Sequence, residues 1–457
     1  TVRIKKDSLE ILSVVLDVFF YIIFFGAISF VFRKFISPNT FKVSRKTGKK
    51  FADVVGMEAL KKNLPDRFMV IFIAFMNMFV PLSTDLYLPA LPEMSGYFSV
   101  SQSLVSLTLT LFFVFYAISM ILLGPLSDKY GRRPILLFGT SVYTLASVLC
   151  AMAPNIYVLI GARIVEAIGS GAIITVSTAL VKDIFSGSKM KKILAVTQAL
   201  GVIAPIVAPV IGGFLLTFTA WHGAFVLLSV LGAINFILAC LLTETLLPQS
   251  RYQGTMLHSL SLLLEVAHRK DFMLLLLVFA CFSTPFMAYI NLSSFIYVEH
   301  FGLSAQTYSH FYAINASFSI LGPFLYLKLS RRLSKFRLTY ICFALAVFSA
   351  IAMLAVGRDD AVVFLMCYVP YTLANSFTRS HSMNWLLSIT DNNAGTASSV
   401  IKFMQTMFGS FGMMAAALPW PDYIHGLNVI MIFAVMLSFV LWQLVQRFHG
   451  DTIAKAA

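Results

Sequence analysis

Long apolar runs recur along this chain, and they constrain its fold more than any other feature. A helix needs about 20 apolar residues to cross roughly 30 Å of hydrocarbon, where only helices and closed barrels satisfy their backbone polar groups. The composition agrees, because 59% of the residues are hydrophobic and only 12% are charged. We therefore expect an all-α polytopic membrane protein with one span followed by twelve. The runs are 10–33, 68–90, 103–124, 133–152, 156–181, 192–217, 222–242, 272–296, 306–327, 338–356, 361–387, 395–418 and 425–446.

Positive charge is confined to short stretches between the runs, although the formal net charge is +14. Basic residues recur in every second connection, a bias typical of cytoplasmic loops. This bias explains the charge without a nucleic-acid partner, and it predicts a cytoplasmic carboxyl terminus with residues 1–9 on the opposite side. The residues are Arg33, Lys34, Arg45, Lys46, Lys49, Lys50, Lys129, Arg132, Arg133, Lys189, Lys191, Lys192, Arg269, Lys270, Arg331, Arg332, Arg337 and Arg447.

The longest polar connection after the first span divides the following twelve spans into six and six. Two six-span halves of this kind are typical of transporters that rock about a site near the bilayer midplane. We expect four parts, which are an N-terminal anchor and linker (1–62), a six-helix half (63–242), a cytoplasmic loop (243–271) and a second six-helix half with the tail (272–457).

The connection between the second and third of the twelve spans reads GPLSDKYGRRP. Gly124 is expected to let two helices approach closely, and Gly131 to permit a tight turn. Asp128 places a carboxylate at a helix end, while Arg132 and Arg133 anchor the loop in the cytoplasm. The stretch resembles the loop signature G-x-L-x-D-x-x-G-R-R of the major facilitator superfamily. That resemblance implies a twelve-helix fold and a gating role for Asp128, Arg132 and Arg133.

The fifth of the twelve spans contains GVIAPIVAPVIGG, with Gly201, Pro205, Pro209, Gly212 and Gly213 at close intervals. Glycine and proline at this spacing predict tight helix contact and a local bend. The stretch resembles the fifth-span motif of major facilitator antiporters, which implies exchange rather than symport.

The fourth span carries two ionisable residues in GARIVEAIGSG. Arg163 and Glu166 are three apart, so they project from one helix face and can pair. Ionisable groups inside a membrane are functional by default. The stretch resembles the R-x-x-Q-G motif of drug/proton antiporters, which implies proton coupling for Arg163. Because Glu166 and Ala167 replace the usual Gln and Gly, Glu166 either neutralises Arg163, which we favour, or titrates itself.

The first of the twelve spans ends in PLSTDLYLPALP, which places Asp85 within an apolar run. The stretch resembles the first-span motif of twelve-span drug/proton antiporters, and with the other motifs it indicates the Bcr/CflA multidrug-resistance branch over about residues 64–447. Asp85 is then expected to face the central cavity beside Arg163 and to carry a proton. The alternative is that Asp85 lies in the headgroup region and caps the helix end.

The substrate cavity is less well defined by the sequence. Aromatic, methionine and a few polar side chains suit a large amphipathic organic compound, cationic or neutral. Each candidate can equally serve helix packing. The candidates are Asn77, Tyr87, Tyr289, Asn291 and Phe295, with Arg379 and Lys402 as further ionisable groups near the cytoplasmic face.

The first 62 residues do not fit this pattern. KKFADVVGMEALK resembles the segment that joins the last membrane helix of FtsH-type proteases to their ATPase, where F-A-D-V-x-G opens that module. The chain contains neither a G-x-x-x-x-G-K-[ST] phosphate loop nor an H-E-x-x-H zinc motif. The five cysteines show no metal-binding or redox spacing. We expect a protease-derived membrane anchor, natural or engineered, and no cofactor, metal or catalytic activity.

These features favour a proton-coupled multidrug efflux antiporter of the bacterial inner membrane. The expected partners are a drug-like small molecule, protons and the lipid bilayer, and the expected state is a monomer. Two alternatives stay open, namely a proton-coupled nutrient symporter and a non-transporting membrane adaptor of a protease complex.

Overall fold

The computed structural model describes residues 66–254, 256–390 and 394–455, and these ranges contain only helices, turns and short irregular connections. The predicted span at 10–33 and the FtsH-like segment lie outside the described residues.

The N-terminal bundle precedes the connection at 243–271. Its elements are α3 (Asp66–Asp85), η2 (Leu88–Ala90), α4 (Leu91–Phe98), α5 (Gln102–Tyr130), α6 (Arg132–Ala151), α7 (Ile156–Ile184), α8 (Gly187–Leu215) and α9 (His222–Leu241). The C-terminal bundle follows that connection. Its elements are α11 (Lys270–Ala280), α12 (Ser283–Phe295), η4 (Ile296–His300), α13 (Ala305–Phe318), α14 (Leu321–Leu329), α15 (Lys335–Val356), α16 (Ala361–Ser388), α17 (Ala394–Ala416) and α18 (Tyr423–Lys455).

Twelve helical segments in the described ranges match the predicted twelve spans. Nine of them are long and apolar enough to cross a membrane by length and hydropathy. The other three segments are α8, α13 with α14, and α17, and each coincides with a predicted run. The all-α expectation is therefore confirmed for the described part of the chain.

Two boundaries differ from the sequence prediction. The first span does not end at residue 90 but continues through η2 and α4 to Phe98. Pro89 and Pro92 each lie in the first turn of a helix, where proline is tolerated, so they do not end the span. The polar connection at 243–271 contains a short η3 (Pro248–Ser250) and an apolar helix α10 (Met256–His268). With 13 residues, α10 is too short to span a membrane.

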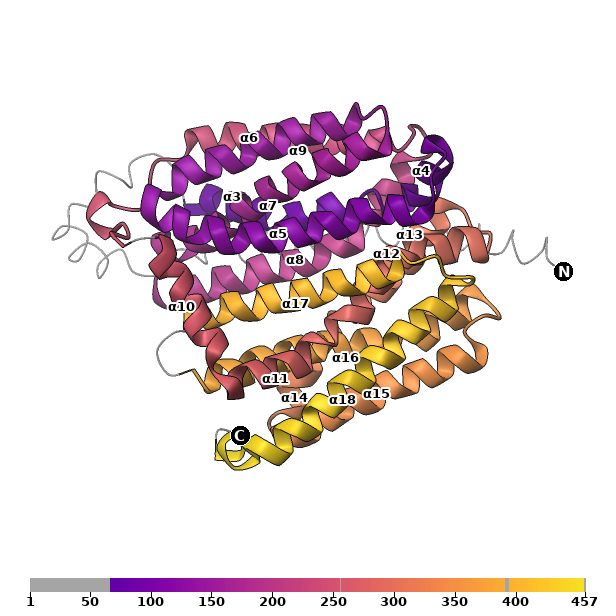
Figure 1. Ribbon diagram of the computed structural model, residues 1–457. Coiled ribbons are helices and arrows are strands. Elements are labelled where there is room, and N and C mark those ends of the chain that lie inside the picture. The colour runs from indigo at the N-terminus through magenta and orange to yellow at the C-terminus, as the bar shows by residue number, and fades with distance from the viewer. Residues whose placement is uncertain (1–65, 255, 391–393, 456–457) are drawn as a thin grey trace.

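The two bundles lie one above the other in Figure 1, with their helices roughly parallel. They meet where α8 packs against α13 and α5 against α17. Inside the N-terminal bundle, α6 and α7 approach closely because of glycine: a Cβ at Gly169 would lie 2.7 Å from the carbonyl oxygen of Gly139. Inside a bilayer no hydrophobic driving force brings helices together, so they associate through close packing, which small residues allow.

Candidate transport site

A buried ion pair lies at the centre of the N-terminal bundle. Arg163 and Glu166 both belong to α7, and Arg163 Nη1 lies 2.6 Å from Glu166 Oε2. Neither side chain is exposed. The three-residue spacing on a helix makes this contact possible, as the sequence predicts.

Other donors surround the Glu166 carboxylate. The Ser147 hydroxyl donates to Oε1 at 3.0 Å, and the Cys150 thiol lies 3.7 Å from Oε2. Both residues belong to α6, so the carboxylate links α7 to its neighbour. Three partners for one carboxylate offset the cost of burying its charge.

Aromatic rings enclose the Arg163 guanidinium. Its Cζ lies 4.2 Å from the ring centre of Phe112, 4.7 Å from that of Tyr87 and 5.7 Å from that of Phe225. Cation–π contacts of this kind stabilise a desolvated cation. Its Nε and Nη2 have no hydrogen-bond partner among the described residues. The guanidinium therefore keeps two unused donors.

Tyr87 therefore belongs to the enclosure of Arg163. Its side chain is completely buried, and its hydroxyl lies 3.1 Å from Thr108 Oγ1. Its place in the substrate cavity stays a prediction.

Asp85 is the last residue of α3, two positions before Tyr87. It is 4% exposed, and the Thr84 hydroxyl lies 2.9 Å from its Oδ1. The hydroxyls of Tyr308 and Tyr312, on α13 of the other bundle, lie within electrostatic range of the carboxylate. The acid is thus buried near the contact between the bundles, and its hydrogen-bond partner is Thr84 rather than Arg163.

The end of α8 packs directly on the bend that follows Asp85. A Cβ at Gly212 would lie 1.8 Å from the Leu86 carbonyl oxygen, and one at Gly213 would lie 2.4 Å from Ser309 Oγ on α13. Pro205 and Pro209 lie inside the same helix. The predicted tight contact is thus made by the glycine pair.

Gly201 does not take part in the predicted tight helix contact. A Cβ there would meet nothing within 4 Å, so this glycine makes no close contact.

The predicted gating loop is held by ion pairs within the N-terminal bundle. Arg132 Nη1 lies 2.5 Å from Asp128 Oδ1, and its Nε lies 2.9 Å from Asp183 Oδ2 on α7. The Arg133 guanidinium donates to the Cys240 carbonyl at the end of α9. One short loop therefore connects α5, α6, α7 and α9.

Glu244, which the sequence analysis did not single out, accepts hydrogen bonds at the start of α6. Its carboxylate receives the backbone N–H groups of Arg132 at 2.9 Å and Arg133 at 3.2 Å. An anion at a helix N-terminus is stabilised by the orphan donors there. Gly131 makes the predicted turn with φ 108°, and a Cβ on it would overlap Glu244 Oε2.

Gly124 does not have its predicted role. A Cβ there would lie 3.4 Å from Thr175 Cγ2, which is an ordinary contact. An alanine would fit without moving either helix.

The other predicted cavity residues do not form one site. Tyr289 is buried and stacks on Tyr368 with 4.1 Å between ring centres. Asn291 is buried and donates to the Met413 carbonyl at 3.1 Å, which ties α12 to α17. These two residues serve packing.

Phe295 and Asn77 also make packing contacts. The Phe295 ring lies 6.0 Å from that of Tyr423. Asn77 is partly buried, and its amide donates to the Ile73 carbonyl and to Ser177 Oγ. These residues thus make packing contacts in this structure, as aromatic and amide side chains often do between helices, and their place in a substrate cavity stays a prediction.

Arg379 on α16 and Lys402 on α17 are exposed. Lys402 lies within electrostatic range of Arg379 and of Lys182, which belongs to α7 of the other bundle. Positive charge from both bundles therefore gathers at one end of the molecule.

The opposite end is closed by polar contacts between the bundles. Gln102, at the start of α5, contacts both Glu299 in η4 and Tyr423 at the start of α18. The Tyr423 hydroxyl also donates to Glu299, at 3.2 Å. In the described ranges, no group of three or more His, Cys, Asp or Glu side chains could hold a metal ion.

The sequence matches the model of one protein family over residues 67–413, and that family is the Major Facilitator Superfamily. The chain belongs to the major facilitator superfamily. It is therefore a multi-pass membrane transporter and not an enzyme.

Several curated superfamily members are similar to this chain. An uncharacterized MFS-type transporter, YdgK of Bacillus subtilis, is 29% identical over 72% of this chain and 83% of its own length. A bicyclomycin resistance protein homolog of Haemophilus influenzae is 25% identical over 76% and 89%. The multidrug resistance protein MdtL of Vibrio parahaemolyticus is 25% identical over 84% and 97%.

A solved superfamily structure has the same fold. It is a bacterial homolog of the human lysosomal transporter Spinster in an inward-facing, unoccupied conformation. Its TM-score is 0.65 at 16% identity, with 85% of this chain and 97% of that chain covered. At this identity the likeness carries the fold alone.

Proposed function

We propose that this transporter is a proton-coupled antiporter of the Bcr/CflA type, which exports amphipathic organic compounds across the bacterial inner membrane. The similarity to bicyclomycin- and multidrug-resistance proteins supports the substrate class. The basic connections support a cytoplasmic carboxyl terminus.

The observation that carries the proton coupling is the burial of Asp85 near the contact between the bundles. Rocking of the two bundles changes the surroundings of a group at that contact. A carboxyl group that meets Tyr308 and Tyr312 in one state and water in the other can bind and release a proton once per cycle. Arg163, with two unused donors, packs on Tyr87, two residues after Asp85, and is proposed to act together with that acid in coupling.

Asp85→Asn tests this proposal. The amide keeps the shape of the side chain but cannot titrate, so substrate-induced proton movement is expected to disappear. The measurement is the internal pH of proteoliposomes on addition of a transported drug. The matched control is Asp66→Asn, which removes an exposed acid at the other end of α3 and is expected to leave proton movement intact. Full gradient-driven export by folded Asp85→Asn would refute the coupling role.

The loop built by Asp128, Arg132 and Glu244 is proposed to set the balance between the two transport states. Glu244→Gln is expected to lower turnover by roughly tenfold, since hydrogen bonds to charged groups contribute about 1.5–3 kcal/mol. The apparent substrate affinity is expected to change little. Initial export rates over a range of drug concentrations separate the two effects. Glu265→Gln removes an exposed carboxylate from α10 and serves as the control.

An affinity loss at unchanged maximal rate in Glu244→Gln would contradict that assignment. Asp128→Asn is expected to resemble Glu244→Gln, because both weaken the same loop. A difference in direction between the two variants would show that they do not act together.

A further inference from the structure

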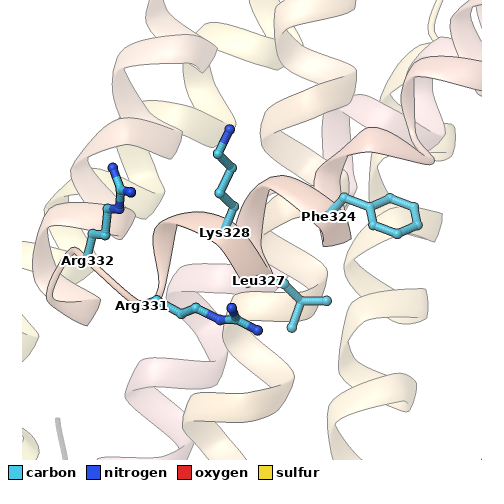
Figure 2. A pocket seen from close by; sticks show the side chains of 5 residues that line it. All are labelled: Phe324, Leu327, Lys328, Arg331 and Arg332. Atoms are coloured by element: carbon cyan, nitrogen blue, oxygen red, sulfur yellow. The ribbon is translucent and has the colours of Figure 1, made fainter.

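A pocket opens on the outside of the C-terminal bundle, at the end of α14. Its volume is about 320 Å³, and Phe324, Leu327, Lys328, Arg331 and Arg332 line it. In Figure 2, Arg331 extends toward Leu327, whereas Lys328 and Arg332 point to the other side of the ribbon. The pocket thus joins apolar and cationic side chains.

The apolar part of this pocket continues along an exposed helix face. Phe324 is 65% exposed and Leu327 is 57% exposed. Positions 324 and 327 share one face of α14, because they are three residues apart, and Arg331 follows in the turn after the helix ends at Leu329. A transmembrane segment that exposes such side chains presents them to lipid. Phe324 and Leu327 thus form an apolar stripe. This stripe ends at a cation, Arg331, where the hydrocarbon of the bilayer meets the membrane surface.

The three cations of the pocket differ from Arg132 and Lys189, two basic residues of the same topological side. Arg132 pairs with Asp128 and Asp183, and Lys189 pairs with Asp66 at 2.6 Å. Among the described residues, no acidic side chain pairs with Lys328, Arg331 or Arg332. Topology alone requires positive charge in this connection but does not require it to surround a pocket.

We propose that this pocket binds one anionic phospholipid of the cytoplasmic leaflet. The phosphate group would lie at the end of α14, held by Arg331 beside the apolar side chains and attracted by the nearby charges of Lys328 and Arg332, and an acyl chain would run along Leu327 and Phe324. Basic pockets on the cytoplasmic side of membrane helices suit anionic headgroups. A free phosphate would use the cations alone, so the adjoining exposed apolar stripe favours a lipid.

The test measures lipid selectivity of the purified full chain by native mass spectrometry. The protein is titrated with phosphatidylglycerol and, separately, with zwitterionic phosphatidylcholine. The native chain is expected to bind one phosphatidylglycerol in preference. Replacing Lys328, Arg331 and Arg332 together by Gln is expected to reduce that preference by about tenfold or more. Arg331→Lys with Arg332→Lys keeps the charge and is expected to retain most of it.

The matched control removes three other cations of the same side that do not line the pocket, by Lys129→Gln, Lys270→Gln and Arg337→Gln. Equal losses in the pocket and control variants would overturn the proposal, because general surface charge would then explain binding. Unchanged preference in the pocket variant would overturn it as well.

A second arm separates a lipid from a free anion. Phe324→Ser with Leu327→Ser removes the apolar stripe and leaves all three cations. This variant is expected to lose phosphatidylglycerol preference, and inorganic phosphate at millimolar concentration is expected not to displace the lipid from the native chain. Displacement by phosphate, with no effect of the apolar substitutions, would identify an inorganic-anion site instead.

Discussion

Arg163→Ala is expected to destabilise the purified protein by roughly 3–5 kcal/mol, because it leaves the Glu166 carboxylate buried without its cation. It is also expected to abolish drug-induced proton movement, because the resemblance to the R-x-x-Q-G motif implies a coupling role for Arg163. Thermal unfolding in detergent and proteoliposome pH measurements give the two readouts. A variant as stable and as well coupled as the native chain would remove Arg163 from the mechanism.

Two further variants separate charge from geometry at this position. Arg163→Lys keeps the charge but loses the planar group that stacks between Phe112 and Tyr87, so an intermediate stability is expected. Arg163→Met with Glu166→Gln removes both charges. That double variant is expected to be more stable than Arg163→Ala and still uncoupled, since a buried pair can be replaced by neutral groups at little cost.

Glu166→Gln decides between the two roles that the sequence leaves open for this acid. Gln is the usual residue of the R-x-x-Q-G motif. If Glu166 only neutralises Arg163, drug-induced proton movement persists in the variant with reduced stability. The direct contact with Arg163 favours this outcome, because it already occupies the carboxylate together with Ser147 and Cys150.

The fold could be predicted because the length of each apolar run and the charge between runs follow directly from bilayer thickness and the asymmetry of positive charge. The family match confirms the fold class. Contacts inside one helix or turn were also predictable, as the Arg163–Glu166 pair and the Gly131 turn illustrate. The division of the chain into an anchor, two halves and a loop stays a prediction.

Contacts between distant segments could not be predicted in the same way. Glu244 lies more than one hundred residues after the loop that it caps, and Tyr308 and Tyr312 approach Asp85 from the other bundle. Spacing gives the direction of a side chain on its own helix, but it does not say which helix lies opposite. A weak signal existed for Glu244, since it is one of few acids in the basic connections.

For the same reason, the sequence does not distinguish the glycine pair of α8, Gly212 and Gly213, from Gly201 and Gly124. Every glycine in an apolar helix permits close approach, but only the arrangement of neighbours decides whether the approach occurs. The structure distinguishes them by what a methyl group would meet. That difference leads to a graded prediction along one helix.

Gly212→Ala is expected to be the most disruptive single methyl addition in α8. Its Cβ would lie 1.8 Å from the Leu86 carbonyl oxygen and 2.9 Å from the carbonyl carbon. Both atoms belong to the backbone of the bend after Asp85, so no side-chain rotation relieves the overlap. A loss of folded protein after detergent extraction is expected. The matched control Gly201→Ala meets nothing within 4 Å and is expected to be neutral or stabilising by up to about 1 kcal/mol.

Gly213→Ala is expected to act differently, because its overlap is with Ser309 and Gln306 of the other bundle. The bundles can relieve it by separating at that end, so the protein stays folded while its conformational equilibrium shifts away from the closed contact. Spin labels at Ser101 and Leu418 report the distance across that end. They are introduced in a Cys240→Ser background, which removes the one exposed cysteine of the described residues. A longer mean distance in Gly213→Ala than in Gly201→Ala is expected. Identical distances, with normal transport by Gly213→Ala, would show that the α8–α13 contact does not control opening.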